Sequence, residues 1–390
     1  MARPPKSPPP PRSAPAKRSS SSAAAAGDGQ GKAARAKKTA RAKSSGAGAA
    51  RREGTARAAR REPFVFDDTV IAPGTVGRVD IPVGRLPPDT SSRLPVWIAH
   101  GRYPGPVVWL SAAIHGDELN GVAIVREVFA QLRPKALAGT VLAVPVVNVF
   151  GILQQSRYLP DRRDLNRSFP GSPRGSLASR LAHLFFDSIV RRCSLGIDFH
   201  TGSNGRANLP QIRCDLDTPD TLALATAFGP PLVLDAKLRD GSLRSAAADL
   251  GTPVLLYEAG EALRFDEHAI GAGVRGTLRV LRARGMVDDA PDPPDVPPVV
   301  ALGSTWTRAG RSGFCHLSVE LGDRVEDGQV VGRVVDTVGG KGRPVHARHG
   351  GVVIGRSTSA LVYRGDAVVH VAKVDAWPPG VTALGVRGAT

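Results

Sequence analysis

Continuous apolar runs alternate with helical stretches over the middle of this chain, and this alternation is the strongest constraint on its fold. The apolar runs, rich in Val, Ile and Leu, cover residues 106–114, 139–148, 195–199, 230–236 and 252–260. The helical stretches cover residues 118–132, 176–193, 220–228, 242–250 and 269–287. Runs without polar alternation are typical of strands that are covered on both faces. The pattern therefore predicts an α/β fold with a mostly parallel mixed sheet flanked by helices.

The two flanks of this region differ from its middle. Residues 69–86 and 94–101 indicate short strands joined by Pro/Gly turns, an antiparallel entry to the sheet. Residues 291–297 are rich in Pro and Asp and predict a linker. Beyond it, helical periodicity is lost, and short strands alternate with Gly-Asp and Asp-Gly turns. We expect an α/β domain at 63–290, this linker, and a small all-β barrel-sandwich-like module at 298–390.

The positive charge of the chain lies mainly in its first 62 residues. The formal net charge is +17, of which residues 1–62 carry +13 and the remainder +4. These first residues contain no Leu, Ile, Val, Phe, Tyr or Trp, so they have almost nothing to bury against the entropy cost of folding. We expect a disordered basic tail. This tail could bind polyanions weakly and without specificity, or it could be a solvated extension without a partner, and the sequence leaves both alternatives open.

Two expected absences narrow the class of protein. No apolar segment follows the first basic residues as in a secretory signal, and no run of about 18 apolar residues predicts a membrane span. We therefore expect a cytoplasmic protein without membrane contact. The three cysteines, Cys193, Cys214 and Cys315, are too few and too scattered for a disulfide framework or a cysteine zinc site.

Polar side chains end two of the predicted strands. His115 and Glu118 follow one strand in the stretch HGDE, and His200 ends another in the stretch DFHTG. Because ligands collect beyond the carboxyl ends of parallel strands, we expect these side chains to meet at one edge of the sheet. Imidazole nitrogen and carboxylate oxygen suit Zn²⁺, and three protein ligands plus a water define a catalytic zinc site. For each histidine taken alone, the alternative is a core histidine whose ring nitrogens are hydrogen-bonded within the protein.

Two other carboxylates accompany these strands. Asp198 lies two residues before His200, on the same strand face, and could orient an imidazole. Glu258, in the stretch YEAGE, would reach the same sheet edge and exchange a proton with a metal-bound water. Glu261 competes for that role, and we favour Glu258 because it stands at the strand end. Asp117 receives no role.

The segment SRYLPDRRDLNRSFPG, residues 156–171, is too rich in Arg and Asp for ordinary core. The guanidinium groups of Arg157 and Arg167, with Asn166 beside them, would form a receptor for a carboxylate, because Arg donates two parallel hydrogen bonds to such a group. The alternative is a solvated loop in which Asp164 pairs with a neighbouring Arg.

Four stretches, HGDE, DLNRSFPG, DFHTG and YEAGE, together resemble the motifs of the succinylglutamate desuccinylase/aspartoacylase family of zinc carboxypeptidase-like hydrolases. The resemblance covers about residues 70–290, and an appended β module is also common in that family. It implies one Zn²⁺ per chain, held by His115, Glu118 and His200.

Further roles follow from the same resemblance. Asn166 and Arg167 would hold a substrate carboxylate. Arg157 would polarise the scissile carbonyl, and Glu258 would act as general base and acid. The resemblance therefore implies a complete set of groups for amide hydrolysis.

The implied function is zinc-dependent hydrolysis of the amide bond of a small-molecule N-acyl amino acid or similar small amide. Two extra residues separate the RY pair from DLNR compared with the family pattern, so Arg162 and Arg163 are rivals of Arg157. A carboxypeptidase-like peptidase or amidase is the alternative within the same chemistry. A non-catalytic protein that binds polyanions through its basic tail is the alternative of another class. The oligomeric state is open.

Overall fold

The structure is a computed structural model that describes residues 61–86, 90–375, 377 and 383–384. Its helices are α1 (Asn120–Gln131), α2 (Leu177–Ser188), α3 (Thr221–Phe228), α4 (Leu243–Ala248) and α5 (Glu267–Ala283), and two 3₁₀ turns are η2 (Leu165–Arg167) and η3 (Val190–Arg192). The first strands are β1 (Phe64–Phe66), β2 (Thr69–Ile71), β3 (Thr75–Leu86), β4 (Thr90–His100), β5 (Tyr103–Ala112), β6 (Ala138–Val144), β7 (Leu195–Gly202), β8 (Arg206–Cys214), β9 (Leu232–Asp235) and β10 (Val254–Glu261). The C-terminal strands are β11 (Val299–Ala301), β12 (Ser304–Arg308), β13 (Gly313–Leu317), β14 (Arg324–Val325), β15 (Val330–Asp336), β16 (Gly339–His346), β17 (Gly351–Ser357), β18 (Leu361–Val362) and β19 (Ala367–Ala372).

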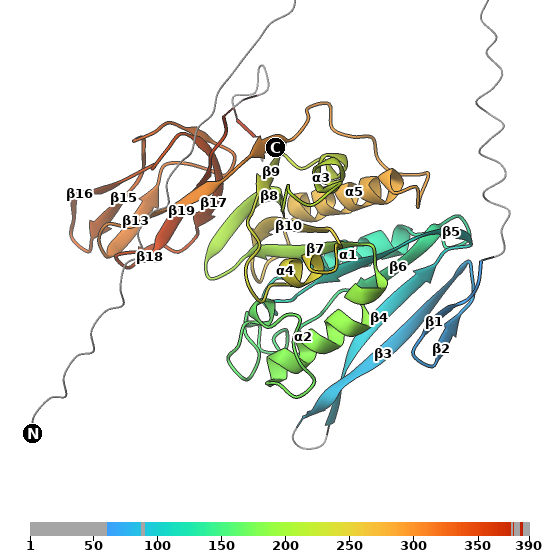
Figure 1. Cartoon of the computed structure of the whole chain (residues 1–390). Helices are drawn as coiled ribbons and strands as arrows, with labels where there is room; N and C mark the ends of the chain where they lie inside the picture. The colour runs from blue at the N-terminus through green and yellow to red at the C-terminus, as the bar shows by residue number, and fades with distance from the viewer. Residues whose placement is uncertain (1–60, 87–89, 376, 378–382, 385–390) are drawn as a thin grey trace, which may run out of the picture. The chain divides into compact units, whose positions relative to one another are not determined.

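A large mixed sheet forms the centre of the fold (Figure 1). Its strand order is β12-β19-β17-β8-β10-β7-β5-β6-β4-β3, and β9, β11 and β14 pair beside this path. The middle strands β6, β5, β7 and β10 are parallel. The entry strands β3 and β4 are antiparallel, as predicted, and so are β8 and the C-terminal strands β12, β17 and β19. The sheet is therefore mixed, as predicted, but its parallel pairs are confined to the middle strands and to the pairs that β9 makes with β8 and β11.

Helices cover both faces of the parallel strands, which explains their continuous apolar runs. On one face α1, α3 and α5 pack through residues such as Ile124, Phe228 and Val274. On the other face α2 and α4 share a core with Trp109 and Leu142 of the sheet. Four of the five predicted helical stretches contain one of these helices, and the fifth, 269–287, overlaps α5, which begins two residues earlier.

Local sequence signals fix where two of these helices begin. The Ser176 side chain accepts a hydrogen bond from the backbone nitrogen of Ser179, and Ser242 accepts one from Ser245. Such side-chain caps satisfy backbone donors that the first helical turn leaves free. They set the start of α2 and α4 immediately after the two serines.

The carboxyl ends of β5, β7 and β10 lie at one edge of the sheet because these strands are parallel neighbours. All eight residues of β7 are buried, including Asp198 and His200. Helix α1 approaches β7 closely at Gly121, where an added Cβ would lie 2.5 Å from the Cβ of Phe199. The fold thus carries polar side chains of β7 into its interior and holds the loop before α1 against them.

The C-terminal strands continue the large sheet rather than standing apart from it. β17 pairs with β8, and β11 pairs with β9. A second sheet, β16-β15-β13-β18, packs its apolar residues with those of β17 and β19 in a Val-rich core. Strand β8, which joins the two parts, was absent from the predicted strands. The barrel-sandwich class and the domain limits at 63–290, 291–297 and 298–390 stay predictions.

Most of the predicted tail, residues 1–62, lies outside the described residues. Its last two residues contact the sheet: Arg61 donates a hydrogen bond to the carbonyl oxygen of Gly101, and the carbonyl oxygen of Glu62 lies 3.0 Å from Nε2 of His100. Within the described part of the chain, no helix combines the length and hydropathy that a bilayer crossing requires.

Candidate metal centre and active site

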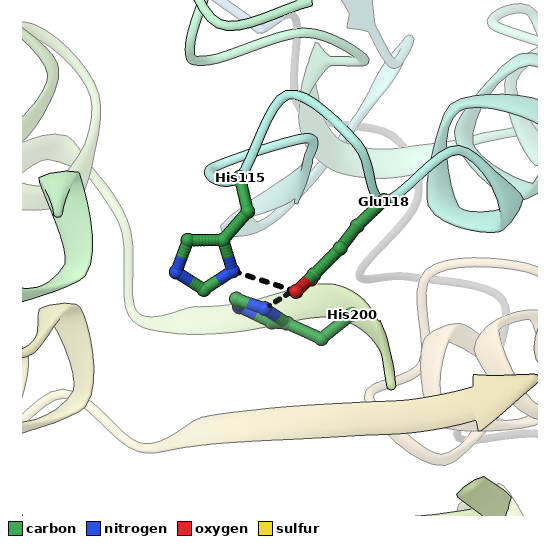
Figure 2. A group of neighbouring side chains, drawn as sticks. All are labelled: His115, Glu118 and His200. Atoms are coloured by element: carbon green, nitrogen blue, oxygen red, sulfur yellow. Dashed lines mark hydrogen bonds and ion pairs between the residues drawn. The ribbon is translucent and has the colours of Figure 1, made fainter. Parts of the chain in front are cut away.

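Two imidazoles and one carboxylate converge at the carboxyl edge of the sheet (Figure 2). Nδ1 of His115 lies 2.8 Å from Oε1 of Glu118, and Nδ1 of His200 lies 2.7 Å from Oε2 of the same carboxylate. One ligand atom from each residue lies within 4.8 Å of the others, and all three side chains are buried. The structure therefore brings together the three side chains predicted from two separate strand ends.

Each imidazole has a second carboxylate at its other nitrogen. Nε2 of His200 lies 2.8 Å from Oδ2 of Asp198, and Nε2 of His115 lies 3.2 Å from Oδ1 of Asp164. Asp198 is itself held by a 2.7 Å hydrogen bond from Ser111. The contact expected of Asp198 is present, whereas the contact of Asp164 with a histidine was not predicted.

The charges of this cluster support one another. Burial opposes ionisation of Glu118, but His115 and His200 hold the pKa of its carboxyl well below the usual range. Burial likewise opposes protonation of His200, yet the carboxylates of Asp198 and Glu118 raise the pKa of its imidazole well above the usual value. The same balance, with Glu118 and Asp164 as partners, raises the pKa of His115. The site is thus a buried polar cluster whose members stabilise one another's charges.

The donor set fits a zinc ion. Both rings turn Nδ1 toward Glu118 and Nε2 toward another carboxylate, which is the usual arrangement of a metal-binding histidine oriented by an outer acid. Two imidazoles and a carboxylate, with no further protein ligand in the cluster found among the described residues, match the open type of site that keeps a position for water. His115, Glu118 and His200 are therefore the residues that could hold the metal.

Arg157 reaches this cluster, and its two sequence rivals do not. Its guanidinium group bonds Oδ2 of Asp164 through Nε at 3.1 Å and through a terminal nitrogen at 2.8 Å. Another terminal nitrogen lies 3.5 Å from Oε1 of Glu118. Burial opposes its charge, but the carboxylates of Asp164 and Glu118 raise the pKa of Arg157. Arg162 and Arg163 are exposed and lie outside the cavity lining.

Asn166 and Arg167 lie in η2, beside the same cluster. Asp164 begins this turn by accepting a hydrogen bond from the backbone nitrogen of Asn166. The side-chain oxygen of Asn166 accepts a 2.9 Å hydrogen bond from the backbone nitrogen of Leu243, which ties the turn to α4. Arg167 donates to the carbonyl oxygen of Asn166, and both residues line the cavity at the metal cluster.

Glu258 lies on β10 next to β7, paired in register with His200. Nδ2 of Asn208 donates to its Oε2 at 2.6 Å, and a terminal nitrogen of Arg213 lies 3.5 Å from its Oε1. Glu261, the competing acid, stays on β10 instead of starting a helical turn, and Gly260 has a positive φ of 72° between the two. Glu261 accepts a hydrogen bond from Thr358 and does not line the cavity of the metal cluster.

A cavity of about 760 Å³ brings most of these groups together. Its lining includes seven residues predicted from the sequence: His115, Glu118, Arg157, Asn166, Arg167, His200 and Glu258. It also includes Asn208 and Arg213, which sequence reasoning missed because β8 was not predicted. For Asp164, the sequence shows only that an Asp stands directly before a turn that carries two proposed substrate-binding residues, and not that it contacts a histidine.

Asp117 points to a second cavity, of about 520 Å³, which shares Arg157 and Asn204 with the first. Its Oδ1 is buried without a hydrogen-bond partner among the described residues. Burial, followed by the charge of Glu118, raises the pKa of its carboxyl. Asp117 is therefore not part of the three-residue cluster, in line with the absence of an assigned role.

Comparison with known proteins shows which family this region of the chain is similar to. Residues 104–284 match the model of the succinylglutamate desuccinylase/aspartoacylase catalytic domain. The N-alpha-acetyl-L-2,4-diaminobutyric acid deacetylase of Halomonas elongata is 29% identical over 289 residues, which are 70% of this chain and 84% of that protein.

Solved structures agree. The succinylglutamate desuccinylase/aspartoacylase from Rhodobacter sphaeroides is 27% identical with a TM-score of 0.70, and the match covers 77% of this chain and 95% of that one. The product-bound ectoine utilization protein EutE (DoeB) from Ruegeria pomeroyi has a TM-score of 0.71 at 23% identity, over 80% and 98% of the two chains, and shows the shared fold. Residues 104–284 therefore match the succinylglutamate desuccinylase/aspartoacylase catalytic domain, and the resemblance carried by the four motifs is confirmed.

Proposed function

We propose that this protein is a zinc-dependent deacylase that hydrolyses the amide bond of a small N-acyl amino acid. The observation that carries the proposal is the buried convergence of His115, Glu118 and His200 beside Glu258 in one cavity. The deacetylase from Halomonas elongata supports the reaction class. Zinc held by the three ligands would polarise the substrate carbonyl and lower the pKa of a bound water toward about 7.

The chain's own residues supply the proton transfers. Glu258 takes a proton from the attacking water and later returns it to the nitrogen of the leaving amine, the role of a general base that becomes a general acid. Asn208 fixes Oε2 of Glu258, and Oε1, which lies 3.5 Å from a terminal nitrogen of Arg213, is the oxygen that would take the proton. The hydrolysis yields a free carboxylate and a free amino acid.

Arg157 is placed to stabilise charge that develops on the carbonyl oxygen. Asp164 holds its guanidinium group through two hydrogen bonds, and the remaining terminal nitrogen turns toward Glu118 and Ser203. A donor fixed before the reaction stabilises the tetrahedral intermediate without reorganisation. Asn166 and Arg167 would bind the substrate carboxylate and so fix the amide relative to Glu258.

Metal analysis combined with an amide panel tests this proposal. The purified chain should contain about one zinc per chain, lose activity on treatment with a chelator, and regain it on addition of Zn²⁺. It should release acetate or succinate from at least one N-acyl amino acid, and Glu258→Gln should abolish release while retaining the metal. A metal-free protein that is inactive on every amide after zinc addition contradicts the proposal.

The same experiment separates the alternatives. Release of a C-terminal amino acid from peptides in preference to an acyl group would indicate a carboxypeptidase-like peptidase or amidase. An inactive chain that binds nucleic acid with steep salt dependence would indicate the polyanion-binding alternative, for which residues 1–62 are the candidate segment. The cytoplasmic location and the weak polyanion binding of that segment stay predictions.

A further inference from the structure

Strand β10 changes its register with both neighbouring strands immediately after Glu258. Glu258 pairs with His200 of β7 and Glu261 pairs with Gly202, so three steps along β10 correspond to two along β7. On the other side, the register with β8 shifts between Glu258 and Gly260. Such a bulge disrupts the ladder and redirects the strand, and bulges are common next to active sites. Backbone groups at this bulge therefore need partners other than the regular ladder.

The side chain of Asn120 supplies such a partner. Its Nδ2 donates a 3.2 Å hydrogen bond to the carbonyl oxygen of Ala259, the residue that follows Glu258. Its Oδ1 accepts a 3.0 Å hydrogen bond from the backbone nitrogen of Asp266, the residue that caps α5. Asn120 is only 1% exposed, so both ends of its carboxamide are bonded inside the protein. One side chain thus connects the start of α1, the bulge of β10 and the start of α5.

Gly260 allows the carboxamide of Asn120 to approach the bulge this closely. A Cβ added at Gly260 would lie 2.6 Å from Nδ2 of Asn120 and 3.2 Å from Oδ2 of Asp266. The φ of Gly260 is 72°, a conformation that favours glycine. The contact between α1 and β10 therefore depends on glycine both for its backbone conformation and for space.

Asn120 belongs to the same turn as the metal cluster. It stands two positions after Glu118, and its bond to β10 joins this turn to the segment that follows Glu258. On the other side of Glu118, the carbonyl oxygen of Asp117 accepts a 2.7 Å hydrogen bond from the backbone nitrogen of Leu263. Both flanks of Glu118 are therefore bonded to the segment that follows Glu258.

We propose that Asn120 is a positioning residue of the deacylase: together with Gly260 it holds the bulge of β10, and so fixes Glu258 relative to the metal cluster. This proposal rests on the proposed function, in which Glu258 is the acid/base. Asn208 bonds the carboxylate of Glu258 itself, whereas Asn120 bonds the backbone that carries it. A misplacement of about 1 Å can cost about a hundredfold in rate. The contribution of Asn120 therefore falls on turnover more than on substrate binding.

Asn120→Ala removes both hydrogen bonds and tests the proposal. We expect kcat on the best N-acyl amino acid to fall about tenfold to a hundredfold, because Glu258 is no longer held in place. KM should change by less than about threefold, since the groups that bind substrate are retained. The zinc content should stay at that of the wild-type protein. Gln131→Ala, which removes an exposed carboxamide from the same helix, is the matched control and should keep the normal kcat.

Gly260→Ala disturbs the same contact from the side of β10 and carries the test if Asn120→Ala does not fold. Its added Cβ displaces the carboxamide of Asn120, so the same fall in kcat with little change in KM is expected. Gly251→Ala is the matched control for backbone strain. Gly251 has a φ of 71°, and an added Cβ there would have no described neighbour within 4 Å.

A double variant separates positioning from a merely structural role. Asn208→Ala removes the hydrogen bond to the carboxylate of Glu258. If Asn120 acts through the same carboxylate, the combined loss of kcat in Asn120→Ala/Asn208→Ala is smaller than the product of the two separate losses. Independent structural weakening would instead multiply the two losses.

An unchanged kcat in the folded variants, losses that multiply, or a fall in kcat that follows loss of zinc overturns the positioning role and leaves the deacylase function intact. If the wild-type protein hydrolyses no amide after zinc addition, the proposed function fails. Hydrogen exchange of the segment around Ala259 then decides whether Asn120 holds the bulge. Faster exchange there in Asn120→Ala than in Gln131→Ala supports this contact, and equal exchange refutes it.

Discussion

Nδ2 of Asn208 donates a 2.6 Å hydrogen bond to Oε2 of Glu258, and Asn208 is almost fully buried between β10 and β17. A hydrogen bond to a charged group contributes about 1.5–3 kcal/mol, so its loss is large enough to matter for catalysis. The proposed acid/base is therefore positioned by a strand whose other edge is held by the C-terminal part of the chain.

Removing this donor should lower turnover more than substrate binding. For Asn208→Ala we expect kcat to fall about tenfold to a hundredfold with a smaller change in KM, because Glu258 loses its fixed orientation. Steady-state kinetics on the best N-acyl amino acid measures both constants. Gln131→Ala, which removes a carboxamide from an exposed turn of α1, is the control. An unchanged kcat in the folded Asn208→Ala variant would remove the positioning role.

The outer carboxylate of His200 should govern metal affinity. In Asp198→Asn the ring keeps a hydrogen-bond partner of similar size but loses the negative charge 2.8 Å from its Nε2. Such changes typically weaken metal binding about tenfold to a hundredfold. Competition with a chromophoric chelator measures the zinc Kd, and Asp187→Asn on the surface of α2 is the matched control. Equal zinc affinity in Asp198→Asn and the control would argue against His200 as a ligand.

Burial should make two of the three thiols inert in the native protein. It raises the pKa of Cys214 to about 12, and it raises the pKa of Cys193 further. At pH 8 only roughly 10⁻⁴ of the Cys214 thiol is then ionised, and the thiolate is the reactive form. We expect an aromatic disulfide reagent to label neither residue until a denaturant is added, whereas half-buried Cys315 reacts slowly. Fast labelling of Cys193 or Cys214 in the folded protein would contradict the buried positions.

The same pKa shift determines the direction in which the stability of the protein changes with pH. The folded pKa of Cys214 lies above the ordinary thiol value of 9.0, so the unfolded chain loses this proton first as the pH rises. The contribution of this buried thiol to the free energy of unfolding is complete below about pH 9 and declines between pH 9 and the pKa of the folded protein. The urea midpoint should therefore fall from pH 8 to pH 10, and less steeply in a folded Cys214→Ala variant.

The cluster of His115, Glu118 and His200 could be predicted because its members end or follow strands that the local sequence alone indicates to be buried. His115 and His200 both follow continuous apolar runs, and parallel neighbours bring such ends together. The carboxylate that contacts His115 was harder to predict. Asp164 lies in a polar loop, and nothing in the loop itself indicates that one oxygen faces His115.

Strand β8 shows why the remaining parts of the sheet and of the site could not be predicted from the sequence. Its sequence, RANLPQIRC, alternates polar and apolar residues as an edge or half-buried strand does. It also contains Pro210, and a proline argues against a central strand. It is nevertheless a strand because β10 lies on one side and β17 on the other, and β17 comes more than 130 residues later. Pairing over such a separation leaves no local signal. The antiparallel continuation of the sheet into its C-terminal strands and the contact of Asn208 with Glu258 both depend on it.

Arg157 offers the sharpest test of the proposed oxyanion donor, because the sequence contains two rivals that the structure separates from the site. Removing one preorganised donor typically costs about 10²–10³ in rate, so Arg157→Ala should lose that factor in kcat. Arg162→Ala and Arg163→Ala change exposed residues outside the cavity lining and serve as matched controls near the normal rate. The metal content of each variant is measured as well, because Asp164 contacts both Arg157 and His115, so that a change at Arg157 could also affect metal binding. A zinc-loaded Arg157→Ala enzyme with normal kcat would assign the oxyanion to another donor.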